Sequence, residues 1–109
     1  MKIIAITQKG PSKTENEDRI IVGKNIIAEG IFQTQLPNGI VAVADGVGGN
    51  NAGAVASHYI AKKLSFLIMS FRKPMRNCYL FHLSVQTTKI WQLLFLAFHF
   101  MVELHKCLV

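Results

Sequence analysis

Two groups of acidic residues carry the chain's capacity for chemistry. Asp45 follows the apolar run 40–44 and precedes the glycine-rich segment 46–49. The second group is the cluster Glu15-Asn16-Glu17-Asp18. A carboxylate at the end of a buried strand, followed by residues without bulk, lets a metal ion approach the backbone closely. Because hard cations take oxygen ligands, the two groups together predict metal-dependent phosphate chemistry.

Four strands and a helix are expected to position these residues. The apolar patterns predict strands over residues 3–7, 19–22, 26–33 and 40–44. The turn sequence Pro37-Asn38-Gly39 predicts a hairpin that joins the last two of these strands. Asn50 or Asn51 can cap a helix that begins near Ala52. Asp45 would then lie between a strand and a helix.

The helix expected from Ala52 is amphipathic. Helical spacing places one apolar set on a single face, namely Ala56, Ile60, Leu64 and Leu67. Lys62 and Lys63 turn away from that face, and Pro74 would end the helix. This pattern predicts a helix packed on a sheet, and we expect His58 to lie on its surface or partly buried.

The composition changes in the second half of the chain. No glycine occurs after Gly53, and Glu103 is the only acidic residue after Asp45. Residues 71–109 therefore form a hydrophobic and basic tail, which we expect to be helical or irregular because neither strand nor helix periodicity persists in it. Our hypothesis is that this tail arises from a frameshift. Translation of the other two reading frames past the codon for Phe66 tests it.

Charge and hydropathy indicate a cytoplasmic chain without a nucleic-acid partner. The net charge is +6, but the basic residues are scattered and form no stripe. Cys78 and Cys107 give neither a disulfide framework nor a metal-binding spacing. The uncharged run 90–102 would span about 20 Å as a helix, short of the ~30 Å hydrocarbon core. A membrane partner is therefore not expected.

The joint pattern resembles a known family. Segment 13–18, with Asn-Glu-Asp, and segment 43–49, with Asp-Gly-x-Gly-Gly, are similar to the amino-terminal part of bacterial PPM (type 2C) serine/threonine phosphatases. The resemblance covers about residues 1–70. It implies an α+β fold, a partial and truncated antiparallel β-sandwich with a flanking helix. It also implies two Mn²⁺ or Mg²⁺ ions between the sheets and a metal-bridging water that attacks a phosphoserine or phosphothreonine of a protein substrate.

The resemblance assigns roles to five residues. Asp45 matches the aspartate that bridges the two metals, and Gly46 matches the residue whose carbonyl binds one of them. Glu17 matches an acid that binds the other metal, directly or through water, so Asp45 and Glu17 are the catalytic candidates. Asp18 matches a neighbouring, supporting metal-site acid. Lys13 stands where the family usually has an arginine for the substrate phosphate, and lysine lacks the bidentate fork.

One departure from the family limits the expected activity. The family supplies further metal-binding aspartates downstream, whereas Asp18 and Asp45 are the only aspartates of this chain. We therefore expect the chain to be an inactive or weak phosphatase. Two alternatives stay open: a non-catalytic remnant that binds a phosphoprotein or a partner, and a small membrane-associated protein anchored by residues 90–102. The histidines of the second half, His82, His99 and His105, have no ligand spacing and no expected role.

Overall fold

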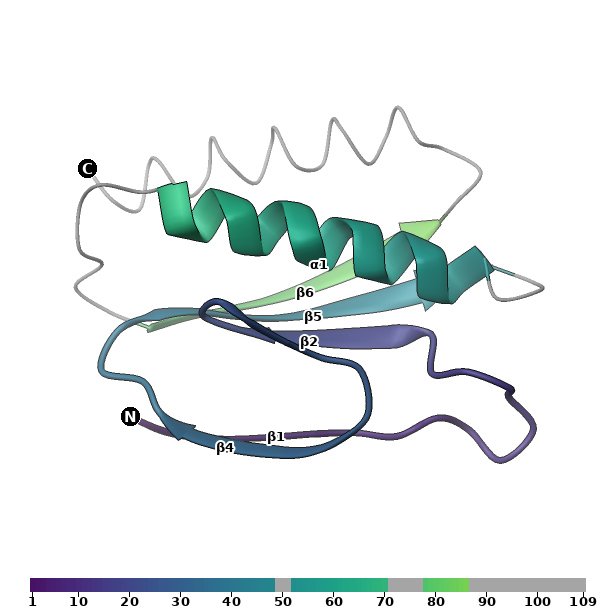
Figure 1. The fold of residues 1–109 in the computed structure, drawn as a ribbon, viewed down its shortest axis with the longest axis horizontal. Coiled ribbons are helices and arrows are strands. Elements are labelled where there is room, and N and C mark those ends of the chain that lie inside the picture. The colour runs from purple at the N-terminus through teal and green to yellow at the C-terminus, as the bar shows by residue number, and fades with distance from the viewer. Residues whose placement is uncertain (49–51, 71–77, 87–109) are drawn as a thin grey trace.

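The fold is taken from a computed structural model, which describes residues 1–48, 52–70 and 78–86. The elements are, in chain order, β1 (Lys2–Thr7), β2 (Asp18–Val22), β3 (Asn25–Ile27), β4 (Gly30–Gln35), β5 (Gly39–Val47), α1 (Ala52–Ser70) and β6 (Cys78–Gln86). Helix α1 covers one face of a four-stranded sheet, and the two-stranded sheet β1–β4 lies against the other face (Figure 1). The expected α+β class is confirmed.

The four-stranded sheet has the order β3-β2-β5-β6 and is mixed. Strand β2 pairs antiparallel with β3 and with β5, whereas β6 runs parallel to β5. A parallel pair needs a long crossover, and α1 lies within this one. The expectation of a purely antiparallel arrangement is therefore wrong at β6. The expectation of a helical or irregular tail is also wrong for Cys78–Gln86, because this segment is a strand that pairs with β5 along its whole length.

The predicted hairpin between residues 26–33 and 40–44 does not form. The first segment divides at Gly30, whose φ of 92° breaks the strand, into β3 and β4. Strand β4 pairs with β1, and the pairing continues where Leu36 N–H donates to the Met1 carbonyl over 2.8 Å. The chain then crosses to the other sheet and enters β5 at Gly39, which has φ 138°. The chain does bend at Pro37 and Asn38, but the turn sequence could not specify which strand pairs with β4.

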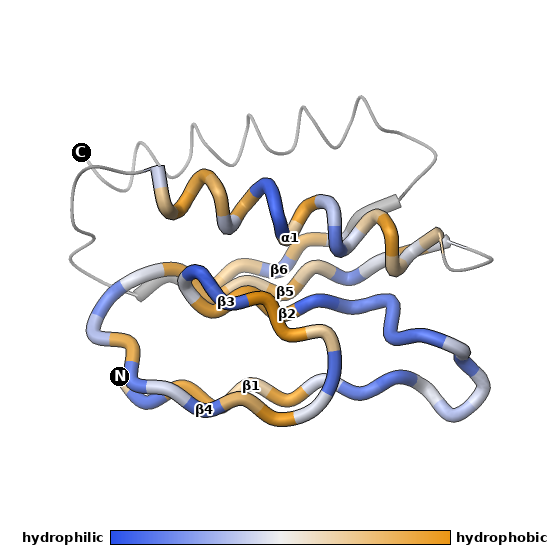
Figure 2. Tube along the Cα trace, in the orientation of Figure 1, coloured by the Kyte–Doolittle hydropathy of each residue, from blue (hydrophilic) through white to orange (hydrophobic). Residues whose placement is uncertain are grey.

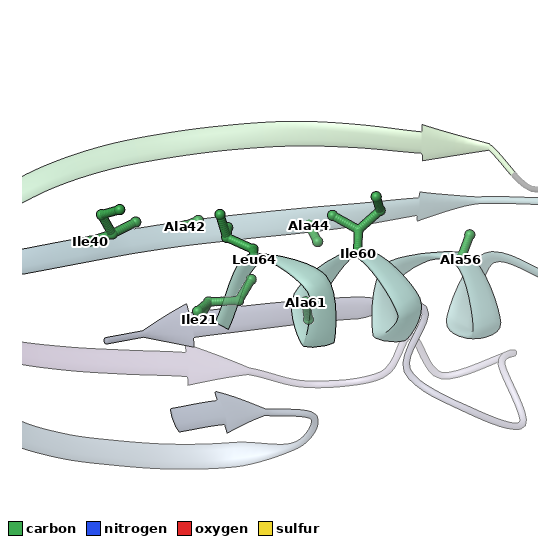
Figure 3. Close-up of a cluster of buried hydrophobic side chains, with 8 residues drawn as sticks. All are labelled: Ile21, Ile40, Ala42, Ala44, Ala56, Ile60, Ala61 and Leu64. Atoms are coloured by element: carbon green, nitrogen blue, oxygen red, sulfur yellow. The ribbon is translucent and has the colours of Figure 1, made fainter. Parts of the chain in front are cut away.

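The larger core lies between α1 and the four-stranded sheet (Figure 3). Its buried residues are Ile21, Ile40, Ala42, Ala44, Ala56, Ile60, Ala61 and Leu64. Small residues on both β5 and α1 let the helix approach the sheet closely. The predicted inward face of the helix is confirmed for Ala56, Ile60 and Leu64, while Leu67 is half-buried and Lys62 and Lys63 are exposed.

A second, smaller core lies between the two sheets. Ala5 of β1, Val22 of β2 and Ile27 of β3 are buried there, with Phe32 and Val41 packed against them. Figure 2 shows that the apolar strands lead into a hydrophilic connection between β1 and β2. That connection contains the first acidic cluster. The smaller core therefore fixes the strand end from which the acidic residues project.

The described residues contain no helix that is long and apolar enough to cross a membrane. The run 90–102 and most of the tail, residues 71–77 and 87–109, lie outside the described residues. The expectations for these segments, including the frameshift hypothesis, stay predictions.

Candidate metal and phosphate site

Asp18 and Asp45 lie directly opposite each other on two neighbouring strands. They are register partners in the antiparallel pair of β2 and β5. Side chains of directly opposed residues share one face and lie about 5 Å apart at Cβ. Strand alternation places both aspartates on the face that carries Val41 and Val22, which pack toward the β1–β4 layer. The sequence placed these acids 27 positions apart, and the sheet brings them together.

The surroundings of Asp18 disfavour the charged form of its carboxylate. Partial burial raises the pKa of Asp18 above its ordinary value, and the negative charge of Asp45 raises it further. A hydrogen bond with the Asp45 carboxyl and the charge of Glu17 act in the same direction, while a hydrogen bond from the Gly46 backbone N–H opposes them. A cation or a proton placed between the aspartates would relieve this repulsion. The arrangement therefore favours a positively charged occupant.

Glu17 and Lys13 form an ion pair beside the aspartates. The Lys13 ammonium donates to Glu17 Oε2 over 2.8 Å, and the two side chains are 51% and 16% exposed. The structure thus brings the candidate phosphate ligand against a candidate metal ligand. A phosphate on Lys13 and a metal on Glu17 would each have to compete with this pair.

Gly46 and Gly53 pack backbone against backbone where β5 ends and α1 begins. A Cβ added to Gly46 would overlap the carbonyl oxygens of Gly53 and Glu17. A Cβ added to Gly53 would lie 2.6 Å from the Gly46 oxygen and 3.2 Å from the Glu17 carboxyl carbon. The Gly46 carbonyl and the Glu17 carboxylate therefore border the same glycine. Gly53 was not predicted to have a role, although a glycine one residue into a predicted helix indicates that another segment approaches closely.

Asn16 holds the acidic cluster in place. Its side chain is buried, and its Nδ2 donates to Thr7 Oγ1 and to the Ala28 carbonyl, each over 2.8 Å. Its Oδ1 accepts from the Asp18 backbone N–H over 3.1 Å. These bonds tie the connection between β1 and β2 to two other parts of the chain. Asn16 was part of the recognised motif, but only the fold shows that it positions Asp18.

His82 is a neighbour of the site that was not predicted from the sequence. Its Nε2 lies 3.9 Å from Asp45 Oδ2, and the two side chains are 65% and 47% exposed. The contact is an ion pair only when the imidazole is protonated. Parallel pairing with β5 brings His82 here, opposite Val43. No local spacing could have predicted this proximity, because it depends on the position of β6.

The donor set suits a loosely held hard cation. Within residues 1–48, 52–70 and 78–86, no three His, Cys, Asp or Glu side chains lie close enough together to hold a metal ion. The Asp18–Asp45 pair offers two carboxylates, and Mg²⁺ is often bound through one or two carboxylates with water completing its shell.

Comparisons of the chain with protein-family models, with curated proteins and with solved structures found no match.

Proposed function

We propose that this chain carries a metal site of the PPM phosphatase type, at which Asp18 and Asp45 bind one Mn²⁺ or Mg²⁺ ion. The observation that carries the proposal is the direct opposition of the two aspartates across β2 and β5. Burial is the largest cause of the raised pKa of Asp18, and the negative charge of Asp45 raises it further; this second contribution supports the proposal, because repulsion that favours a proton also favours a cation. The Gly46 carbonyl is the further direct oxygen donor of the proposal, and Glu17, which borders the same Gly53, would bind through a water molecule because it does not group with the two aspartates.

The proposed reaction class is hydrolysis of phosphoserine and phosphothreonine in proteins. When bound, a divalent cation lowers the pKa of a coordinated water and stabilises charge on phosphoryl oxygens. Lys13 is the proposed phosphate-binding residue, and its half-exposed ammonium is accessible to a substrate. Glu17 holds that ammonium 2.8 Å from its carboxylate, so phosphate binding must weaken the Lys13–Glu17 pair.

We further propose that this chain binds the metal without efficient turnover. Two dications a few ångströms apart repel strongly, and further carboxylates are needed to offset that repulsion. Asp18 and Asp45 are the only aspartates, and Glu103 is the only acid after them. The chain therefore lacks the acidic residues that would support a binuclear centre.

Thermal unfolding with and without metal tests the proposal. Mn²⁺ or Mg²⁺ at 100 times Kd should raise the Tm of the protein by roughly 10 °C, because a ligand of the native state stabilises it by mass action (about 2.7 kcal/mol) and about 1 kcal/mol shifts the Tm of a domain of this size by about 4 °C or more. The rise should disappear in Asp45→Asn and persist in Glu29→Gln, which alters an exposed carboxylate of another loop. A Tm insensitive to both cations would overturn the metal site.

A phosphopeptide assay tests the turnover claim separately. We expect no Mn²⁺-dependent release of phosphate from a phosphothreonine peptide by the purified protein. Robust release that is lost in Asp45→Asn would contradict the proposed inactivity and leave the metal site standing.

A second candidate function is phosphoprotein binding without catalysis. The exposed Lys13 ammonium favours it, because an anion can reach that group without any metal. Phosphopeptide binding that persists in chelator and is lost in Lys13→Ala would favour this function over the metal-dependent one.

A further inference from the structure

A groove lies on the α1 side of the molecule, against the start of β2. It has a volume of about 430 Å³ and is lined by Glu15 and Arg19 from the β2 end and by Val55, His58, Tyr59 and Lys62 from the first turns of α1. Strand alternation places Arg19 on the face opposite to Asp18. The groove is therefore separate from the aspartate pair.

Arg19 is a buried cation, and one of its N–H groups makes no hydrogen bond to the described residues. Its side chain is only 6% exposed. One terminal nitrogen, Nη1, donates to the backbone carbonyls of Asn16 and Asp18 over 2.6 and 2.7 Å. Its Nε is buried and has no hydrogen-bond partner among the described residues. A buried guanidinium is stable only beside a compensating anion. The groove therefore favours a negatively charged group next to Arg19.

Glu15 supplies that anion from within the chain. Its Oε1 accepts from Arg19 Nη2 over 3.2 Å, while half of the Glu15 side chain (50%) stays exposed. Only the Glu15 half of the pair is exposed, so its carboxylate can turn toward solvent while Arg19 stays in place. The structure therefore shows that a carboxylate fits beside Arg19. The carboxylate that lies there belongs to the half-exposed Glu15, which a ligand could replace.

The α1 wall of the groove adds positive charge and apolar surface. Lys62 lines the groove, and the neighbouring Lys63 ammonium lies 5.5 Å from the centroid of the Tyr59 ring. Val55 is 67% exposed and Tyr59 is 40% exposed. A ligand that fills this wall would combine a carboxylate with an adjacent apolar side chain.

We propose that this groove binds an acidic segment of a partner protein, whose Asp or Glu carboxylate replaces Glu15 at Arg19 and whose neighbouring apolar side chain packs on Val55 and Tyr59. An acidic partner is proposed because Arg19 and Lys62, which line the groove, are both positively charged. Binding needs no metal, so the failure of the proposed metal site would leave this inference intact.

The test is fluorescence anisotropy with a labelled peptide of alternating Glu and Leu, in buffer that contains chelator and low salt. The protein should bind it saturably, and the matched Gln–Leu peptide should not bind. Lys62→Glu should weaken binding about tenfold or more, because it reverses a charge at the contact. Glu15→Gln should tighten binding several-fold, since it removes the internal competitor for Arg19.

Lys2→Glu is the matched control, because it makes the same charge change on an exposed strand residue outside the groove. It should alter binding less than about twofold if the contact is local. Three results would each overturn the inference: equal binding of the Gln–Leu peptide, equal weakening by Lys2→Glu and Lys62→Glu, or unchanged affinity in Glu15→Gln with a native Tm. The second result would indicate attraction by net charge alone.

Discussion

At the residue scale, the geometry of one aspartate pair governs the electrostatics of the site. Asp18 and Asp45 face each other because their strands pair in one register, and a shift by one residue would send one carboxylate to the opposite face. Asn16 fixes the chain just before this register begins, through hydrogen bonds of its side chain to Thr7, Ala28 and Asp18. The site therefore depends on a buried amide as well as on its acids.

The raised pKa of Asp18 predicts a pH-dependent effect of Asp18→Asn. Between the ordinary value of 3.8 and the raised pKa, the folded protein binds more protons than the unfolded chain, so the free energy of unfolding falls as pH rises through that window. In metal-free buffer at pH 7, Asp18→Asn should therefore be more stable than the wild-type protein. Urea denaturation should show this gain shrinking as the pH falls toward 3.8.

The control for this prediction is Glu29→Gln, which removes a different, exposed carboxylate. It should show no comparable gain at pH 7. A gain for Asp18→Asn that stays constant down to low pH would contradict the assignment to charge repulsion and would indicate an effect of the side-chain shape.

At the element scale, the junction of β5 and α1 is held by glycines. Gly46 must lack a side chain because the carbonyls of Gly53 and Glu17 occupy the space where its Cβ would lie. The φ of Gly46 is not among the positive values, so the constraint is steric. The same glycine pair sets how closely the helix approaches the end of the strand, and thereby where Glu17 lies.

Gly46→Ala should therefore destabilise the protein strongly. Inserting a methyl group against backbone atoms that cannot rotate away costs about 3 kcal/mol, at the upper end of the overpacking range. Chemical denaturation should show this loss, with Gly10→Ala as the control. A Cβ at Gly10 would meet only Lys13 Cγ at 3.6 Å, so that variant should stay within about 0.5 kcal/mol of wild type. Equal stability of the two variants would contradict the steric argument.

At the scale of the whole molecule, the four-stranded sheet extends beyond residue 70. Strand β5 lies between β2 and β6 and contributes Ile40, Ala42 and Ala44 to the larger core. A boundary at residue 70 would remove β6 and leave β5 with unpaired backbone groups along one side. Exposed strand edges of this kind template association between chains.

A comparison of two fragments tests this point. Residues 1–86 should be monomeric by light scattering, whereas residues 1–70 should self-associate or unfold at a lower temperature, because only the shorter fragment exposes the β5 edge. Both fragments lack residues 87–109, so their difference reports on residues 71–86. If the two behaved alike, β6 would contribute nothing to the sheet's integrity.

The sequence determined the elements whose signals are local. Helical spacing located α1 and its buried face, and the apolar run ending at Asp45 located β5. Strand β6 was not predicted, because the alternation of Phe81 and Leu83 with His82 and Ser84 is short and no periodicity persists around it. The predicted features depend on neighbours along the chain, which the sequence displays directly.

The tertiary structure alone decided which strands pair and which side chains meet. The same turn at residues 37–39 is compatible with a hairpin or with a crossing between sheets, and the crossing lets β5 bury Ile40, Ala42 and Ala44 in the larger core while Val41 packs on the smaller one. His82 reaches Asp45 only through the parallel pairing of β6, and the groove around Arg19 forms only where α1 packs beside β2. Partner choice depends on how much apolar surface each arrangement buries across the whole chain, which no local pattern records.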